Sequence, residues 1–397
     1  MIAVETLPNG LVVLLEEDRS APRVAVHVYV EAGAAEDPPG REGLAHLVEH
    51  LAFAGGDYDR RLAALGGASN AWTDHDGTAY WSVAPSDVLG PLLALEGERF
   101  AALAWPDAAL ATQRGVVAQE RAGERLPGGL DHARLSALLW PEGHPYRRRV
   151  LGEPDAVTAE DARAFVARQY RAGATTVAIV GDFDLADARA RVYEALAGLP
   201  AGAGERPAPS PPGPLEVPAR ARVRDDVDRP VVYLGWRGPP RGDPDAVALA
   251  ALAALVERTE VPEGVTLEVR AWSGEHGGSF VVRVRGRRGV SRAVRAVERA
   301  IASLAEAGPP TDALARVRAR ERAAILRATE AVEARAQVFN LCWAATRDVG
   351  CVADVSERWA ALDAPAVARA AARWLDPRSR ATLVVTPPGR PPPRVGR

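Results

Sequence analysis

Two stretches of the chain repeat the same order of hydrophobic and polar positions. In the first half, an apolar run at 24–30 predicts a strand and the apolar stretch at 44–53 predicts a helix. In the second half, the runs at 231–236 and 247–256 form the same pair. An Asp-Pro turn separates strand from helix both times. The pattern therefore predicts one supersecondary unit that occurs twice.

Each half also ends in the same way. An Arg-containing helix at 165–170 is followed by an apolar strand at 176–180, and the second half has 370–375 and 382–385 in that order. Matching elements are offset by about 206 residues at both ends, which indicates a tandem repeat.

The repeat sets the expected domain boundaries. Residues 1–200 and 219–386 form two homologous domains, separated by a Pro- and Gly-rich linker at 201–218. The last segment, 387–397, is a Pro- and Arg-rich tail. Strands and helices that alternate in this way predict an α+β fold of two tandem α/β-sandwich domains.

Composition excludes several classes of function. The 397 residues have a net charge of −3, which gives no electrostatic reason to bind nucleic acid. No apolar run approaches the roughly 20 residues of a membrane helix, so no membrane partner is expected. The 49 basic residues are all arginine, which excludes chemistry that needs a lysine amine.

Two features of the sequence indicate the cellular compartment in which the protein is expected. The first ten residues lack the basic start and apolar core of a signal peptide, so a cytoplasmic protein is expected. Cys342 and Cys351 are too few for a disulfide framework and are interpreted as buried thiols.

The sequence His46-Leu47-Val48-Glu49-His50 holds the strongest chemical signal. On a helix, positions i and i+4 share one face and i+3 lies beside them, so two imidazoles and a carboxylate converge. Neutral imidazoles are good zinc ligands, and a carboxylate beside the metal can take a proton from water. The H-x-x-E-H spacing is typical of inverzincin metallopeptidases.

A catalytic zinc usually has three protein ligands and one open position. Residues 107–125 predict a further helix, on which Val116 and Val117 stand one turn before Glu120. Glu120 is the best candidate for the third ligand. The residues alone leave open that it is a solvated carboxylate on a charged face.

Four segments resemble the M16 peptidases, a family that includes pitrilysin, insulin-degrading enzyme and the mitochondrial processing peptidases. They are residues 46–53, 66–73, 113–120 and 143–146. The resemblance implies zinc held by His46, His50 and Glu120, with Glu49 as the base.

The chain departs from the family pattern in two places. Gln113 stands where the family has a Glu, and we expect it to orient a ligand from outside the coordination shell. Active members also have an Arg and a Tyr in the second half. The matching positions here are Glu260 and Leu267, so this substrate-contacting pair is expected to be missing.

The second half is expected to have no metal site. At the repeat offset, the three motif residues fall on Leu252, Leu255 and Val256, none of which can bind zinc. One zinc ion per chain is therefore expected.

Residues 70–81 alternate as a strand. In the family, the edge of this strand takes up the substrate as an added strand, which makes Asn70 and Ala71 the candidates for substrate binding. An ordinary sheet strand is the alternative. His75, between Asp74 and Asp76, is interpreted as part of an exposed polar turn and not as a second metal site.

These expectations favour a zinc-dependent endopeptidase that acts on peptides or unfolded segments. The missing Arg and Tyr predict a heterodimer with a second M16-like subunit; a homodimer is the other assembly considered. The alternative function is a non-catalytic scaffold or core subunit. A purely structural zinc site is disfavoured, because such sites are normally four-coordinate and rich in Cys.

Overall fold

The computed structural model describes residues 2–54, 57–102, 105–124, 132–206, 209, 211–389 and 392–393. The chain forms two compact units, and each unit is assembled from three segments. Unit 1 comprises residues 1–121, 148–207 and 325–353, and unit 2 comprises 122–147, 208–324 and 354–397.

Unit 1 is built on a six-stranded sheet with the order β1-β2-β6-β3-β5-β4. Its strands are β1 (Ile2–Thr6), β2 (Val12–Glu17), β3 (Arg23–Val30), β4 (Ala68–Thr73), β5 (Thr78–Pro85) and β6 (Thr175–Gly181). Neighbouring strands are antiparallel except β2 and β6, which run parallel. β4 is therefore an edge strand, and only β5 pairs with it among the described strands.

Unit 2 contains a five-stranded sheet with the order β7-β11-β8-β10-β9. Its strands are β7 (Ala219–Arg224), β8 (Val231–Gly238), β9 (Val265–Gly274), β10 (Gly277–Gly286) and β11 (Ala381–Thr386). β7 and β11 are parallel and the other pairs are antiparallel, which repeats the pattern of β2, β6, β3, β5 and β4. The predicted repeat is thus present in both sheets, and the α+β fold is confirmed.

The described helices α1 to α7 belong to the first half of the chain and α8 to α13 to the second. They are α1 (Leu44–Phe53), α2 (Tyr58–Ala64), α3 (Leu89–Ala102), α4 (Asp107–Glu124), α5 (His132–Leu139), α6 (Ala159–Gln169), α7 (Leu185–Leu196), α8 (Asp245–Val256), α9 (Val290–Ala307), α10 (Thr311–Ala328), α11 (Val332–Thr346), α12 (Cys351–Ala361) and α13 (Ala364–Trp374). Between α7 and β7, the described residues contain no helix or strand.

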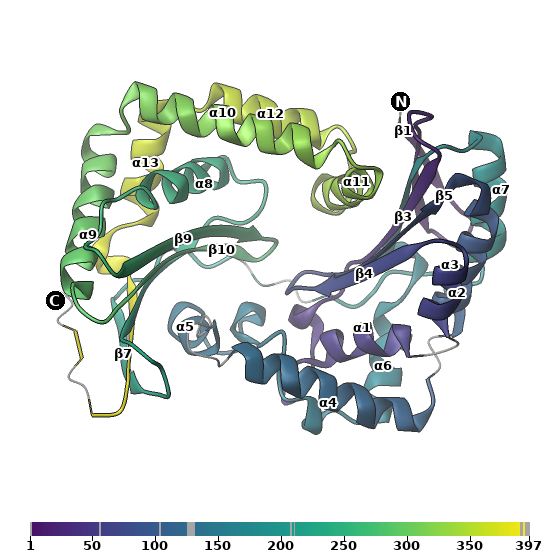
Figure 1. Cartoon of the computed structure of the whole chain (residues 1–397), viewed down its shortest axis with the longest axis horizontal. Coiled ribbons are helices and arrows are strands. Elements are labelled where there is room, and N and C mark those ends of the chain that lie inside the picture. The colour runs from purple at the N-terminus through teal and green to yellow at the C-terminus, as the bar shows by residue number, and fades with distance from the viewer. Residues whose placement is uncertain are drawn as a thin grey trace. The chain divides into compact units, whose positions relative to one another are not determined.

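Alternation along the strands of unit 1 creates two hydrophobic layers. Val24, Val26 and Val28 of β3 join the core formed with α1, α3, α6 and α7. Ala25 faces the opposite way and joins a second cluster, in which Phe339 of α11 packs. The sheet is thereby covered by helices on both faces, and Figure 1 shows α11 beside β3.

The helix on this second face of the sheet comes from the other half of the chain. α11 belongs to the second repeat but packs against β3 and β6 of unit 1. α5 belongs to the first repeat but packs against β8 and β11 of unit 2. The boundaries 1–200 and 219–386 stay a prediction, and the compact units divide the chain differently, with α11 in unit 1 and α5 in unit 2.

One expected strand is a hairpin. Residues 70–81 were expected to alternate as one strand, but they divide between β4 and β5. The cause is a turn at 74–77, in which Asp74 Oδ1 accepts hydrogen bonds from the N–H groups of Asp76 and Gly77. The turn is also packed and not exposed as expected, because Asp76 is buried and His75 is half-buried.

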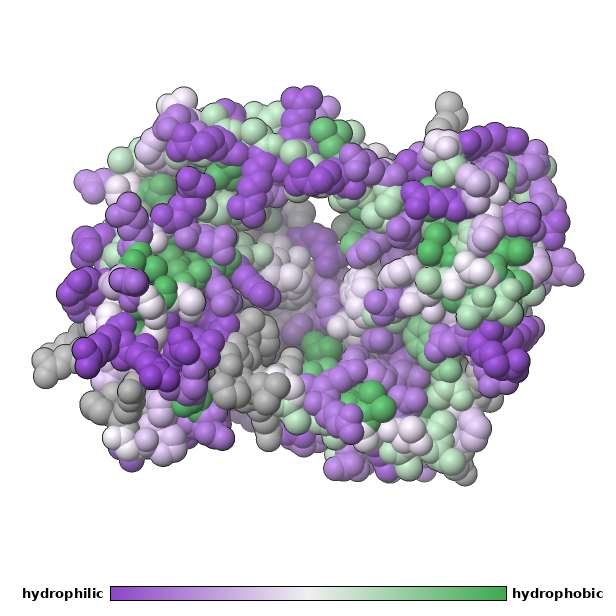
Figure 2. All heavy atoms as spheres, in the orientation of Figure 1, coloured by the Kyte–Doolittle hydropathy of each residue, from purple (hydrophilic) through white to green (hydrophobic). Residues whose placement is uncertain are grey.

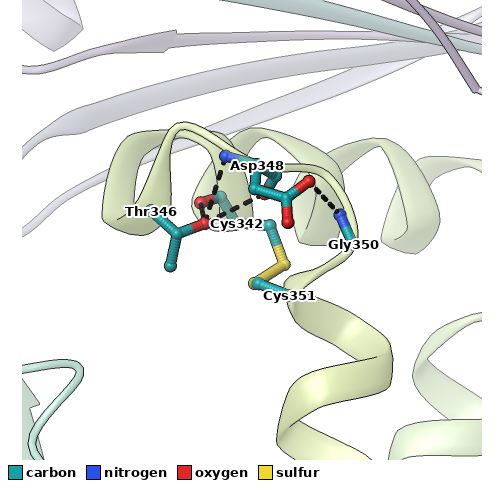
Figure 3. Close-up of a disulfide and its surroundings, with 5 residues drawn as sticks. All are labelled: Cys342, Thr346, Asp348, Gly350 and Cys351. Atoms are coloured by element: carbon teal, nitrogen blue, oxygen red, sulfur yellow. Dashed lines mark hydrogen bonds between the residues drawn. A yellow bond between two sulfur atoms is a disulfide. The ribbon is translucent and has the colours of Figure 1, made fainter.

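The interpretation of the two cysteines as free thiols is wrong. Cys342, near the end of α11, and Cys351, at the start of α12, form a disulfide (Figure 3). Their spacing of nine residues does not itself indicate a pair. The loop after α11 brings the two Cα atoms to 5.5 Å. In that loop, Asp348 Oδ1 accepts a hydrogen bond from the N–H of Gly350.

The surface visible in Figure 2 is predominantly hydrophilic. The large hydrophobic side chains exposed among the described residues are scattered over several elements: Val4, Val116, Tyr193, Val217, Leu326 and Val355. No described helix has the length and apolar character that a membrane span requires.

Candidate active site

The motif helix α1 begins at a backbone position that only glycine adopts easily. Gly43, at its N-cap, has φ +89°, and a Cβ there would meet the backbone of Gly152 at 3.0 Å. Asp37 supplies the capping interaction from outside the helix. Its Oδ2 accepts from the N–H of Gly43 at 2.7 Å and its Oδ1 from that of Ala45 at 2.9 Å. These bonds satisfy N–H groups that a helix start leaves without partners.

One face of α1 packs in the core and the other presents the motif residues. Leu44, Leu47, Val48 and Leu51 are buried in the hydrophobic core of unit 1. His46, Glu49 and His50 form the other stripe, as their i, i+3, i+4 spacing predicts. His46 and Glu49 are buried, and the side chain of His50 is 15% exposed. Packing on the first face thus fixes how the second face presents the motif.

Helix α4 contributes the third member of the cluster. Leu110 and Val117 are buried in the same core, and Gln113 and Glu120 follow them at a spacing of three residues. All four residues therefore lie along one stripe of the helix. Glu120 Oε2 lies 3.6 Å from His46 Nε2 and 3.5 Å from His50 Nε2.

This geometry fits a zinc ion. Ligand atoms at about 2.0–2.2 Å from a tetrahedral zinc lie roughly 3.3–3.6 Å apart, close to the two measured separations. One ligand atom from each of His46, His50 and Glu120 lies within 4.8 Å of the other two. Among the described residues, no other group of three His, Cys, Asp or Glu side chains comes together in this way.

Gln113 contacts a metal-ligand candidate directly. Its Oε1 lies 3.2 Å from Nδ1 of His50. An amide oxygen only accepts, so the His50 proton is on Nδ1 and the lone pair on Nε2 is directed at the cluster. The structure thus places Gln113 beside His50, one of the three candidate ligands.

Burial shifts the pKa values of His46 and Glu49. Desolvation, together with the charge of His50, lowers the pKa of His46 from 6.5 to about 4. His46 is therefore neutral near pH 7, the form that binds a metal. Desolvation raises the pKa of Glu49, whereas the Thr73 hydroxyl and His50 lower it. A carboxylate with a raised pKa is better suited to accept a proton near neutral pH.

One functional contact was missed by the sequence analysis. Thr73 Oγ1 donates a hydrogen bond to Glu49 Oε2 at 2.6 Å. The available signal was the spacing within β4, because residues 71 and 73 share the face toward α1. That signal becomes useful only once β4 is known to pack beside α1.

Ion pairs add to the core packing that places α4 next to α1. Arg121, the residue after Glu120, pairs with Glu153, and Arg149 donates to Glu153 Oε1 at 2.9 Å. The N–H of Glu153 donates to the carbonyl of Glu42, just before α1. The loop that includes Glu153 therefore connects α4, which contains Glu120, to the start of α1.

The edge strand β4 contains the two candidates for substrate binding. The N–H of Ala71 donates to Asn70 Oδ1 at 2.8 Å and is therefore not used in the ladder with β5. Alternation in an antiparallel ladder then directs the backbone groups of residues 69, 71 and 73 to the open edge. The backbone of Ala71 lies where an added strand would pair, and the Asn70 side chain occupies its N–H.

The described residues of the second half contain no equivalent cluster. Leu252 and Val256 of α8 are buried in the core of unit 2, and Leu255 beside them is also apolar. Glu260 lies in the connection between α8 and β9, and Leu267 lies on β9. Neither residue has the chemistry of the Arg and Tyr that the family resemblance led us to look for.

Two family models match the chain. The model described as insulinase, peptidase family M16, matches residues 12–124, and the model described as the peptidase M16 inactive domain matches residues 156–321. The first match contains the whole metal cluster.

Several curated proteins are similar in sequence. Zinc protease PqqE of Helicobacter pylori is 29% identical over 270 residues, covering 63% of this chain and 60% of the relative. Coenzyme PQQ synthesis protein F of Pseudomonas aeruginosa is 33% identical over 252 residues, covering 59% of this chain and 31% of the relative. The matched region is thus less than two thirds of either relative.

A probable β subunit of a mitochondrial processing peptidase from Arabidopsis thaliana is 24% identical, with 64% of this chain and 50% of the relative covered. Among solved structures, a protease from Helicobacter pylori superposes with a TM-score of 0.88 at 22% identity, covering 98% of this chain and 100% of the other. The fold, the matched models and the named relatives agree, and the chain belongs to the M16 family of peptidases.

Proposed function

We propose that this chain is a zinc-dependent endopeptidase that hydrolyses peptides or unfolded protein segments. The observation that supports this most is the convergence of His46, His50 and Glu120, with the buried carboxylate of Glu49 on the same helix face. A structural site would not need Glu49, which is outside the ligand set. One zinc ion per chain is proposed, since the described residues contain one such cluster.

The roles of the side chains follow from their chemistry. His46, His50 and Glu120 would hold the ion, which when bound supplies a Lewis acid and an activated water. Glu49 accepts a proton from the attacking water and later returns it to the leaving amine. Gln113 keeps the His50 ring in the orientation and tautomer that binding needs.

Substrate binding is proposed at the edge of β4. An extended peptide adds to an open edge by backbone hydrogen bonds, which gives affinity without strong sequence preference. A peptide carbonyl would replace Asn70 Oδ1 as the acceptor for the N–H of Ala71. Asn70 would thereby satisfy this donor until substrate arrives.

A second M16-like subunit is the proposed partner. Neither Glu260 nor Leu267 can provide the guanidinium or the phenol that the family pattern has in the second half. A homodimer would not supply these groups, because both copies lack them. The similarity to a chain named as a β subunit supports a heteromeric assembly.

The test is hydrolysis of an unstructured peptide by the purified chain, with and without an M16-like partner chain from the same genome. Activity that disappears with a chelator and returns with zinc supports the proposal. A non-catalytic scaffold subunit is the competing function, favoured by the missing Arg and Tyr. Full zinc loading without hydrolysis in either arm would favour the scaffold.

A further inference from the structure

Thr73 connects the proposed substrate strand to the proposed catalytic base. It is the last residue of β4, and its hydroxyl donates to Glu49 Oε2 at 2.6 Å. Glu49 is buried, and among the described residues Thr73 provides the hydrogen bond that holds its carboxylate. A hydrogen bond to an ionised acceptor is stronger than one between neutral groups.

The direction of this hydrogen bond is set by the Glu49 carboxylate, because an ionised carboxylate only accepts. Thr78 of β5 pairs with Thr73 in the sheet register, and their hydroxyl oxygens are 3.4 Å apart. The Thr78 hydroxyl donates to the carbonyl of Ala32 at 2.8 Å. Thr78 Oγ1 can therefore only accept from Thr73, and it is farther from the Thr73 hydroxyl than Glu49 Oε2 at 2.6 Å, so the Thr73 proton goes to the nearer, charged acceptor.

The backbone around Thr73 is held firmly. The chain turns directly after it, and the N–H groups of Ala34 and Ala35 donate to the carbonyls of Asp74 and His75 at 2.9 Å. A hydroxyl on such a fixed strand end keeps its position when the carboxylate moves. It therefore limits the rotation of Glu49 about its side-chain bonds.

We propose that Thr73 is a positioning residue, whose hydroxyl fixes the Glu49 carboxylate so that Oε1 is the oxygen presented to the attacking water. The bond to Thr73 occupies Oε2, which leaves the other oxygen for the proton. A displacement of about 1 Å in a reacting group can reduce the rate about 10²-fold, so this restraint matters for catalysis.

The same residue links base and substrate. Thr73 follows Asn70 and Ala71 along the edge of β4, and its backbone groups face the open side with those of residue 71. A peptide strand that pairs with β4 would therefore order the strand end that holds Glu49. This step rests on the proposed endopeptidase function.

The test compares Thr73→Val, which keeps the shape but removes the hydroxyl, with Thr73→Ser, which keeps the hydroxyl. For Thr73→Val we expect kcat to fall about 10- to 100-fold, with zinc content and KM unchanged, and for Thr73→Ser near-normal kcat. In a Glu49→Gln background, Thr73→Val should cause no further loss.

Thr175→Val is the matched control. Its buried hydroxyl donates to the carbonyl of Arg171 at a strand start in the same unit, so activity should be unchanged.

Crystal structures of the wild type and of Thr73→Val provide a readout that needs no turnover. We expect the Glu49 carboxylate to leave its wild-type position when the hydroxyl is removed. Full kcat in Thr73→Val, or a carboxylate that stays in place, would overturn the proposal. A wild type that binds no zinc and cleaves nothing would instead reject the endopeptidase function, and the two structures would still decide the role of Thr73.

Discussion

Gln113 Oε1 lies 3.2 Å from Nδ1 of His50, so an uncharged amide stands behind one member of the metal cluster. The M16 pattern has a carboxylate at this position, and a carboxylate would attract the imidazole proton more strongly. The amide still fixes the ring and its tautomer but adds no negative charge. We expect this exchange to weaken, not abolish, metal binding.

Replacing Gln113 tests that relationship. Gln113→Leu should weaken zinc affinity about 10- to 100-fold, because the His50 ring loses its acceptor. Gln113→Glu should bind zinc at least as tightly as the wild type. Affinity is measured by competition with a chelator of known strength. Gln119→Leu, an exposed position on the same helix, is the control, and equal losses in the two leucine variants would contradict this assignment.

Asp37 is expected to affect both stability and the metal site. Asp37→Ala removes the acceptor for two N–H groups at the start of α1, and we expect about 1–2 kcal/mol less stability together with weaker zinc binding. Asp184→Ala is the comparison, because Asp184 caps α7 through the N–H groups of Ala186 and Asp187. It should lower the free energy of unfolding similarly and leave zinc affinity unchanged. A zinc affinity unaffected by Asp37→Ala would show that the cap does not position the motif.

Acid should weaken the contact between α11 and the sheet of unit 1. Asn340 Nδ2 donates to the carbonyl of His27 and to His27 Nδ1, so this ring nitrogen must be unprotonated. Burial lowers the pKa of His27 from 6.5 to about 3. Because the folded-state pKa is depressed, the contribution is complete above pH 6.5 and is lost as the pH falls toward 3.

The measurement is urea unfolding of the wild type and of His27→Gln at several pH values. The advantage of the wild type over the variant should shrink by up to about 1.4 kcal/mol per pH unit below pH 6.5. A difference between the two proteins that does not change with pH would contradict the buried neutral histidine.

Reduction of the disulfide should destabilise the end of α11. The bond closes a loop with a sequence separation of nine, for which chain entropy predicts a loss of roughly 2–3 kcal/mol on reduction. The double variant Cys342→Ser with Cys351→Ser should unfold at the same urea concentration with and without reductant. A wild type that is equally insensitive to reductant would argue against the bond.

The disulfide also bears on the compartment. Such bonds persist mainly in oxidising environments, whereas the start of the sequence led us to expect the cytoplasm. Alkylation of free thiols in protein taken directly from its own cells separates the two. Blocked cysteines would favour an oxidising compartment and reactive ones the cytoplasm.

The sequence predicted the parts of the fold that depend on local patterns. The apolar runs gave β3, α1, β8 and α8 nearly to the residue, because hydrophobic periodicity is a local property. The motif spacing likewise placed His46, Glu49 and His50 on one face. The sequence could not predict which sheet α5 and α11 cover. Each helix stands in its own half of the chain but packs on the sheet built mainly from the other half.

The contacts that the sequence missed all depend on tertiary packing. Thr73 lies beside Glu49 only because β4 packs against α1, and Asp37 caps α1 across an intervening loop. The disulfide requires the loop after α11 to reverse the chain. Side chains that meet over such distances leave no periodic signal.

The proposed role of Glu49 is that of the base beside a bound zinc ion. It is tested by peptide turnover of the wild type and Glu49→Gln at equal zinc content, with the partner chain present. We expect one zinc per chain in both proteins and a turnover about 10²–10⁴-fold lower in the variant. Near-normal turnover by Glu49→Gln, or a zinc-loaded wild type no faster than the variant, would contradict it.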